Sequence, residues 1–262
     1  RGRAGRRRAG ADQALTDTPG TPLARGAGMH ADTRGAAPSL LLINPNTTAA
    51  VTALLLQAGA PHTPPGAQLL GCTAPFGEPY ISDETGLAIA GHAVLTTFDA
   101  QISAGMHPNG VLLGCFGDPG LLALRERASV PVTGLAEAAM RAAAAQGRYA
   151  IVTGGAAWAP MLRRLAFGLD LLAPLAGIVT VAPTGAQLLA DPQAAGALLR
   201  QACEEAAALG ADSVIVGGAA LAGWAERLQP ALAVPLIDSV QAGFTHAWHM
   251  TCEREGTRKE IP

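Results

Sequence analysis

Short apolar runs alternate with helix-length segments along residues 39–250. The runs are apolar at successive positions, which is typical of parallel strands that are buried on both faces. Strands separated by helices of this length predict an α/β fold with mostly parallel sheets. The runs that we expect to form strands lie at 39–43, 67–72, 111–113, 130–132, 148–153, 177–181, 214–216 and 235–237.

Capping signals mark where several helices begin. Asp118 is a good N-cap, and Pro119 suits the first helical position because its missing N–H is not needed there. Asp191 with Pro192 repeats this pair, and Asp238 is expected to cap the last helix. We expect helices at about 48–58, 84–103, 119–128, 137–146, 158–167, 191–209, 224–227 and 239–250.

The arrangement of strand, turn and helix start occurs twice in the chain. Residues 214–223 repeat the strand, turn and helix start of residues 111–120, and alignment of Gly114 on Gly217 places Cys115 on Gly218. More loosely, residues 150–155 resemble residues 41–46. We therefore predict two pseudo-symmetric lobes, each a small, mostly parallel sheet flanked by helices, with the active site in the cleft between them. The first lobe covers residues 39–146, with the C-terminal helix crossing over to it, and the second covers residues 147–250.

The two ends of the chain differ from the middle. Residues 1–38 hold seven Arg and three Asp without apolar periodicity, and we expect a disordered basic extension. An arginine-rich organelle presequence and a nucleic-acid-binding tail are the alternatives for this segment. Residues 251–262 are expected to form a polar tail.

Composition narrows the class of protein. Hydrophobic residues make up 49% of the chain and charged residues 15%, enough apolar content for a sizeable core. Aromatic residues are only 4%, and no basic patch occurs beyond residue 38, so we expect no nucleic-acid partner. No apolar run reaches the roughly 18–20 residues of a membrane span. The four cysteines form no CxxC pair or zinc-site cluster, which favours reduced thiols in a cytoplasmic enzyme without a metal.

Cys115 is the main candidate for chemistry. It lies in a predicted strand-to-helix turn, near backbone N–H groups and a helix N-terminus, a setting that favours a thiolate. If the lobes pack about a pseudo-twofold axis, Cys115 and Gly218 face a bound carbon from opposite sides. Inversion of a carbon centre by proton transfer needs a base on one face and an acid on the other.

Other candidate site residues follow the carboxyl ends of the strands, where α/β sheets bind ligands. Side-chain amides, hydroxyls and turn N–H groups there hold a carbonyl or carboxylate. No dinucleotide or phosphate-loop glycine motif is present. We expect the small-molecule substrate to contact Asn46, Thr47, Tyr80, Phe116, Gly117, Thr153, Gly154, Gly155 and Ala219.

Four segments carry a resemblance to a known family. They are Ile43-Asn44-Pro45-Asn46-Thr47, residues 114–120, Val152-Thr153-Gly154-Gly155 and the turn at Gly217. Over roughly residues 39–248 the chain resembles the aspartate/glutamate/hydantoin racemase superfamily, in particular its hydantoin and allantoin racemases. The resemblance implies a cofactor-independent homo-oligomer that uses one cysteine from each lobe. Cys115 matches the first of these cysteines, whereas Gly218 stands at the place of the second.

Four functions are considered for this sequence, the last being a cysteine hydrolase, which needs a histidine in reach of Cys115. The first is a racemase or isomerase that uses Cys115 at a carbonyl-activated carbon of a hydantoin, an allantoin or an amino-acid-like substrate. A second acid or base would then be water, His92, His107 or Cys72. The second function is a single-thiol decarboxylase or cis–trans isomerase of a small dicarboxylate. The third is a non-catalytic homologue that binds a metabolite.

Overall fold

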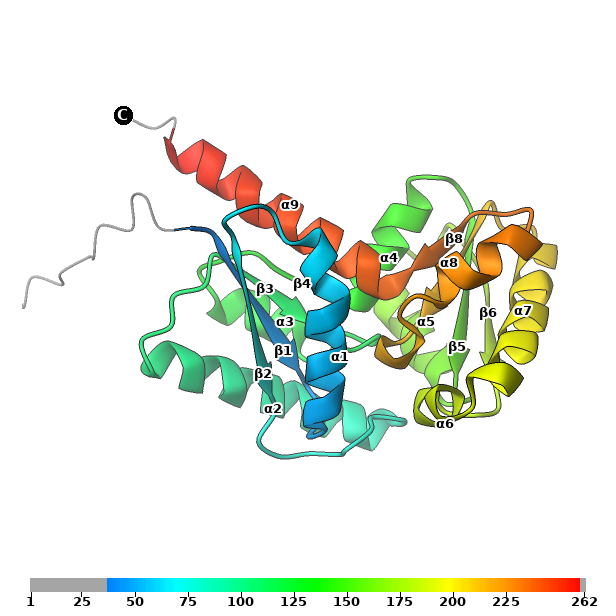
Figure 1. The fold of residues 1–262 in the computed structure, drawn as a ribbon, viewed down its shortest axis with the longest axis horizontal. Coiled ribbons are helices and arrows are strands. Elements are labelled where there is room, and N and C mark those ends of the chain that lie inside the picture. Colours follow the sequence, from blue (N-terminus) through cyan, green and yellow to red (C-terminus); the bar gives the residue numbers. More distant parts are fainter. Residues whose placement is uncertain (1–36, 260–262) are drawn as a thin grey trace, which may run out of the picture. The chain divides into compact units, whose positions relative to one another are not determined.

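The computed structural model describes residues 37–259, apart from some side chains in the sixth, seventh and ninth helices. The predictions for residues 1–36 and 260–262 lie outside the described residues. All strand pairs in the two four-stranded sheets are parallel (Figure 1). The first sheet has the order β2-β1-β3-β4 and the second β6-β5-β7-β8, which confirms the two-lobed α/β fold. The strands are β1 (Ser39–Asn44), β2 (Gln68–Thr73), β3 (Gly110–Leu113), β4 (Val132–Gly134), β5 (Tyr149–Gly154), β6 (Leu175–Val181), β7 (Ser213–Gly217) and β8 (Leu236–Asp238).

Helices connect the strands. They are α1 (Ala49–Gly59), α2 (Glu84–Ser103), α3 (Leu121–Arg127), α4 (Leu135–Ala144), α5 (Trp158–Gly168), α6 (Gly185–Ala190), α7 (Pro192–Ala208), α8 (Trp224–Leu228) and α9 (Ser239–Lys259). Three short 3-10 turns are η1 (Ala60–His62), η2 (Ala219–Leu221) and η3 (Gln229–Ala231). Within residues 37–259, none of the helices has both the length and the apolar character needed to cross a membrane.

Two helix predictions need correction. Helix α9 does not end near Met250 but continues to Lys259, and Thr251 is buried in the part that we expected to be a polar tail. Helix α6 was not predicted, because its six residues carry too little periodicity to be recognised. Its capping box, formed by Thr184 and Gln187, was the available signal.

The strand register reproduces the internal repeat. In the first sheet Leu41 lies opposite Val111, and in the second sheet the matching residues Ala150 and Val214 lie opposite each other. The fourth strands extend this correspondence in both sheets. The backbone therefore equates the two halves as the sequence alignment does, with the thiol turn after β3 matching the glycine turn after β7.

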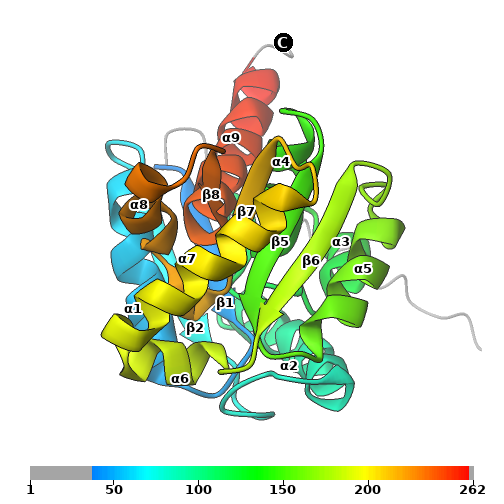
Figure 2. The same ribbon diagram turned by 90° about the vertical axis from the view of Figure 1, so that its right-hand side faces the viewer.

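Two helices cross between the sheets. Helix α4 follows β4 but packs against β7 and β8, while α9 follows β8 but packs against β3, β4 and α4 (Figures 1 and 2). Gly243 in α9 leaves room for Leu135 of α4, since a Cβ there would lie 2.5 Å from a Leu135 methyl carbon. Apolar residues of both sheets, including Leu112 and Ile215, belong to one buried cluster. The lobes therefore share a core instead of meeting through polar surfaces.

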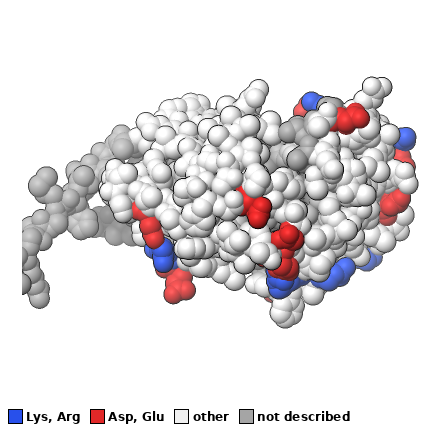
Figure 3. All heavy atoms as spheres, turned by 90° about the horizontal axis from the view of Figure 1, so that it is seen from below, with Lys and Arg blue, Asp and Glu red and all other residues white. Residues whose placement is uncertain are grey.

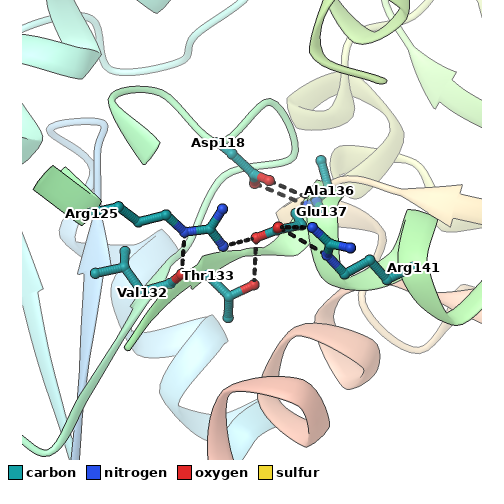
Figure 4. A network of polar contacts seen from close by, with 7 residues as sticks. All are labelled: Asp118, Arg125, Val132, Thr133, Ala136, Glu137 and Arg141. Atoms are coloured by element: carbon teal, nitrogen blue, oxygen red, sulfur yellow. Dashed lines mark hydrogen bonds and ion pairs between the residues drawn. The ribbon is translucent and has the colours of Figure 1, made fainter. Parts of the chain in front are cut away.

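Asp118 does not cap the helix that follows it. Helix α3 begins only at Leu121, after Gly120 with a left-handed φ of 77°. The Asp118 carboxylate instead accepts hydrogen bonds from the N–H groups of Ala136 (3.0 Å) and Glu137 (2.7 Å), in the first turn of α4 (Figure 4). Asp118 therefore fixes the turn that contains Cys115 to a helix of the other sheet.

The absence of a side chain at Gly134 makes this cap possible. Gly134 is the N-cap residue of α4, and a Cβ there would lie 2.1 Å from Oδ1 of Asp118. In the second lobe the residue that matches Gly134 is Asp238, at the end of β8. It caps α9 itself through the N–H groups of Val240 and Gln241, as predicted, and its other oxygen accepts from the N–H of Gly223 at 2.6 Å. Each lobe thus has one carboxylate between its third-strand turn and the helix after its fourth strand. The turn supplies it in the first lobe, as Asp118, and the fourth strand supplies it in the second lobe, as Asp238.

An ion-pair network holds the first turn of α4 in place (Figure 4). The buried Glu137 carboxylate pairs with Arg125 and Arg141 and accepts a hydrogen bond from the Thr133 hydroxyl at 3.1 Å. Burial alone would raise the pKa of Glu137, but the two guanidinium groups outweigh it and lower the pKa. Arg125 also donates to the carbonyl of Val132 at 2.9 Å, which joins α3 to β4.

A matched pair of glycine substitutions tests the cap at Gly134. We expect Gly134→Ala to lower the free energy of unfolding by about 1–3 kcal/mol, because the new methyl group overlaps a carboxylate held by two hydrogen bonds. Gly168→Ala is the control, since no atom lies within 4 Å of its Cβ position. Urea unfolding followed by circular dichroism measures both. Equal stability of the two variants would contradict the proposed role of Gly134.

Candidate active site

A cavity of about 390 Å³ lies between the lobes at the carboxyl ends of the strands. This volume suits a small organic ligand. The turns after β1, β3, β5 and β7 contribute to its wall. Eight of the predicted site residues line it: Asn46, Tyr80, Cys115, Phe116, Thr153, Gly154, Gly218 and Ala219.

Three predicted contact residues do not line the cavity. The N–H of Thr47 donates to the carbonyl of Glu78 at 3.1 Å, and the N–H of Gly155 donates to that of Val181 at 2.8 Å. Gly117 gives space to Trp158 of α5, because a Cβ at Gly117 would lie 2.4 Å from the indole ring. These three residues shape the turns and not the cavity surface.

Cys115 lies at the cavity wall with 9% of its surface exposed. Burial, reinforced by the negative charge of Asp118, raises the pKa of its thiol well above the usual range. Our expectation of a favoured thiolate is therefore wrong for this structure. The physical reason is burial first and the charge of Asp118 second. In addition, α3 starts only at Leu121, so the helix N-terminus that we invoked does not lie at the thiol. The raised pKa favours the protonated thiol.

Gly218 contributes bare backbone to the same cavity. Its φ is 140° and its ψ is 137°, a conformation that side-chain-bearing residues rarely adopt. Space itself is available, because the nearest atom to an added Cβ would be a Leu221 carbon at 3.6 Å. Cys115 has no such positive φ. The two matched turns therefore differ in backbone conformation as well as in side chain.

Asn46 is held with its amide nitrogen available to the cavity. Its Oδ1 accepts hydrogen bonds from Nδ2 of Asn44 (3.0 Å) and from the N–H of Thr48 (2.9 Å). Asn44 also donates to the Thr52 hydroxyl at 3.0 Å, so the whole turn is fixed by buried amides. This network orients Asn46 so that Nδ2 becomes the donor for a ligand.

The second lobe supplies a hydroxyl and an indole. Thr153, at the end of β5, is buried and lines the cavity beside Gly154. Trp158 lines it from the first turn of α5. Trp158 begins the helix that we predicted at 158–167, shortly after Gly154 and Gly155. This position was an available signal for a wall residue, and we did not use it.

Each lobe has an aromatic ring that packs against a glycine of the other lobe. Phe116 of the first lobe lies against Gly217 of the second, where a Cβ would be 2.2 Å from the ring. Trp158 of the second lobe lies against Gly117 of the first in the same way. These two contacts bring the turns after β3, β5 and β7 together around the cavity.

The cavity wall carries no formal charge. Among the described residues that line it, none is Asp, Glu, Lys, Arg or His, and the two ionisable side chains are Cys115 and Tyr80. The face in Figure 3 is mostly uncharged, with acidic and basic side chains in small mixed groups.

The other candidates for a second acid or base lie away from the cavity wall. His92 is exposed and packs on Phe76, with ring centroids 5.2 Å apart. His107 precedes β3, at the opposite end of that strand from Cys115. Cys72 lies in β2 with its thiol directed to the carbonyl of Leu42.

Alkylation rates test the protonation state of Cys115. With iodoacetamide at pH 7 we expect exposed Cys252 to react at least about tenfold faster than Cys115, because only the thiolate reacts. The Cys115 rate should rise with pH up to pH 9. Mass spectrometry of peptides, with a Cys252→Ser control, measures each site. Faster labelling of Cys115 than of Cys252 at pH 7 would contradict the raised pKa.

Comparison with known proteins places this architecture in a family. The family described as Asp/Glu/Hydantoin racemase matches residues 40–247. Hydantoin racemase of Rhizobium meliloti is 30% identical over 212 residues, which cover 79% of this chain and 86% of that protein. Hydantoin racemase of Paenarthrobacter aurescens is 29% identical over 212 residues, covering 78% and 86%.

A solved structure agrees with these relatives. Allantoin racemase from Klebsiella pneumoniae has a TM-score of 0.76 to this structure at 31% sequence identity, covering 83% of this chain and 89% of that one. The resemblance drawn from the turns is thereby confirmed. The chain belongs to the Asp/Glu/hydantoin racemase family, on its hydantoin racemase-like branch, and is an enzyme of that racemase type.

Proposed function

We propose that the protein is a cofactor-independent, racemase-like enzyme in which Cys115 moves a proton at a carbonyl-activated carbon of a hydantoin- or allantoin-like substrate. The observation that carries this proposal is the position of Cys115. It is the thiol in the wall of an uncharged cavity where the turns of both lobes meet. The relatives of this protein on the same branch are named hydantoin racemase and allantoin racemase.

The reaction begins with the thiolate form of Cys115. The sulfur takes the proton from the substrate carbon, and the electron pair moves onto the adjacent carbonyl oxygen. Fixed donors stabilise the resulting enolate. The cavity is lined by residues that can supply such donors, namely Asn46, whose Oδ1 is already engaged, and Thr153 with its hydroxyl. The thiol then returns a proton to carbon.

The uncharged wall favours a neutral substrate. A cyclic ureide presents N–H and carbonyl groups that pair with amides and hydroxyls. A dicarboxylate or an acidic amino acid would bring formal charges next to a wall without a cation, and burying such charges unpaired is costly. The cavity therefore supports the ureide over the dicarboxylate alternative and over an acidic amino acid.

The remaining expectations accompany this proposal. We propose a cytoplasmic homo-oligomer that acts on a small molecule, without a nucleic-acid or membrane partner. The non-catalytic alternative rests on the glycine at position 218, and it predicts ligand binding without any turnover. Activity that depends on Cys115 separates the two.

Removal of the thiol should abolish proton exchange. We expect Cys115→Ala to lower the rate of exchange at C5 of a 5-substituted hydantoin at least about 100-fold, because the proton-transfer group is lost. Cys72→Ala is the matched control and should retain the rate within about threefold, since Cys72 lies outside the cavity. Proton NMR in D₂O measures both. Full exchange by Cys115→Ala would refute the proposed role.

The rate should also depend on pH in a defined direction. The raised pKa of Cys115 leaves a small thiolate fraction at neutral pH, and this fraction grows with pH. We therefore expect the rate of C–H removal to rise roughly tenfold per unit between pH 6 and pH 8. Exchange at constant temperature and ionic strength gives this slope. A rate that falls or stays flat over the range would exclude Cys115 as the base.

A further inference from the structure

The acid and base groups of the cavity all belong to one lobe. Cys115 and Tyr80, the ionisable side chains of its described wall, are both in the first lobe. The second lobe contributes a hydroxyl, an indole and the backbone of its glycine turn. The residues that it contributes are Thr153, Gly154, Trp158 and 217–221. None of these takes up a proton from carbon near neutral pH.

The backbone of the second turn maintains this asymmetry. Gly218 occupies the position that matches Cys115, but with a φ of 140°. A side chain there would force the turn into another conformation. The turn is therefore built for glycine, and the part of the wall formed by this turn consists of main chain and the apolar residues of η2.

Tyr80 is held on the side of the first lobe. Its loop is fixed to the turn after β1, where the N–H of Thr47 donates to Glu78 at 3.1 Å and the Thr48 hydroxyl donates to the carbonyl of Pro79 at 2.7 Å. Tyr80 therefore lines the cavity from the same lobe as Cys115. This makes Tyr80 the alternative that an experiment must test.

We propose that proton transfer in this protein is confined to one face of the substrate carbon. This inference rests on the proposed proton transfer by Cys115 and limits it to exchange without inversion, so it predicts that this member of the racemase family does not interconvert enantiomers. The Cys115 thiolate takes the proton of one enantiomer, the electron pair moves onto the carbonyl oxygen, and the thiol exchanges its hydrogen with solvent. The same sulfur returns the hydrogen isotope to the same face, and the thiolate is restored. The product keeps its configuration.

The other enantiomer meets no acid or base side chain of the described cavity wall. Its hydrogen points towards the glycine turn of the second lobe when the ring occupies the same donors. The protein therefore exchanges one enantiomer and leaves the other unchanged. In this it departs from an enzyme with a thiol in each lobe, which inverts both.

Exchange of each separate enantiomer tests the inference. The full chain is incubated in D₂O with the D- or the L-form of a 5-alkyl hydantoin, with buffer alone and Cys115→Ala as controls. Proton NMR follows the C5 hydrogen, and chiral chromatography follows configuration. We expect one enantiomer to exchange at least about 100-fold faster than the other, without inversion above the controls.

The other outcomes separate the two proposals. Deuterated product of opposite configuration, or exchange of both enantiomers at similar rates, would overturn one-faced transfer while supporting the proposed function. Inversion that disappears in Tyr80→Phe, while exchange continues, would overturn it by identifying Tyr80 as the second acid. No exchange of either enantiomer above Cys115→Ala would overturn the proposed function, and the inference with it.

Discussion

Two aromatic rings, each lying where the opposite lobe has a glycine, determine the geometry of the cavity. Phe116 contacts the Gly217 position and Trp158 contacts the Gly117 position, so a side chain at either glycine would push the lobes or the rings apart. Because protein interiors are close-packed, such contacts fix the distance between the turns. Helices α4 and α9 also hold the two lobes together, since each follows one sheet and packs on the other.

The two lobes have similar backbones, but only the first lobe supplies ionisable side chains to the described cavity wall. Strand order is the same in both, and so is the register of the pairs β1–β3 and β5–β7, although β5–β6 has a register shift at Tyr149 and Ala150. Each lobe also has a carboxylate between its third-strand turn and the helix after its fourth strand. That carboxylate is Asp118 in one lobe and Asp238 in the other. The turns differ more, with a buried thiol in one and a positive-φ glycine in the other. A repeat can thus keep its fold while only one copy keeps an acid or base.

Much of this architecture could be predicted from the pattern of apolar runs. The long helix at 84–103 has the predicted bounds, and the alignment of the halves agrees with the strand register. Local capping rules placed Asp238 correctly but failed for Asp118, because its hydrogen-bond partners in α4 lie 18 and 19 residues away in the sequence. The same limit applies to the thiol. Its pKa depends on burial in the folded protein, which a local turn pattern does not contain.

The most direct test of this account is a crystal structure of the protein with a 5-alkyl hydantoin bound. We predict the ring in the cavity between the lobes, with Sγ of Cys115 about 3–3.5 Å from C5, the separation of a near-attack arrangement. The backbone of Gly218 should face the opposite side of that carbon, without an ionisable side chain in reach. A ligand bound elsewhere, or a second acid or base on the Gly218 side of C5, would contradict the account.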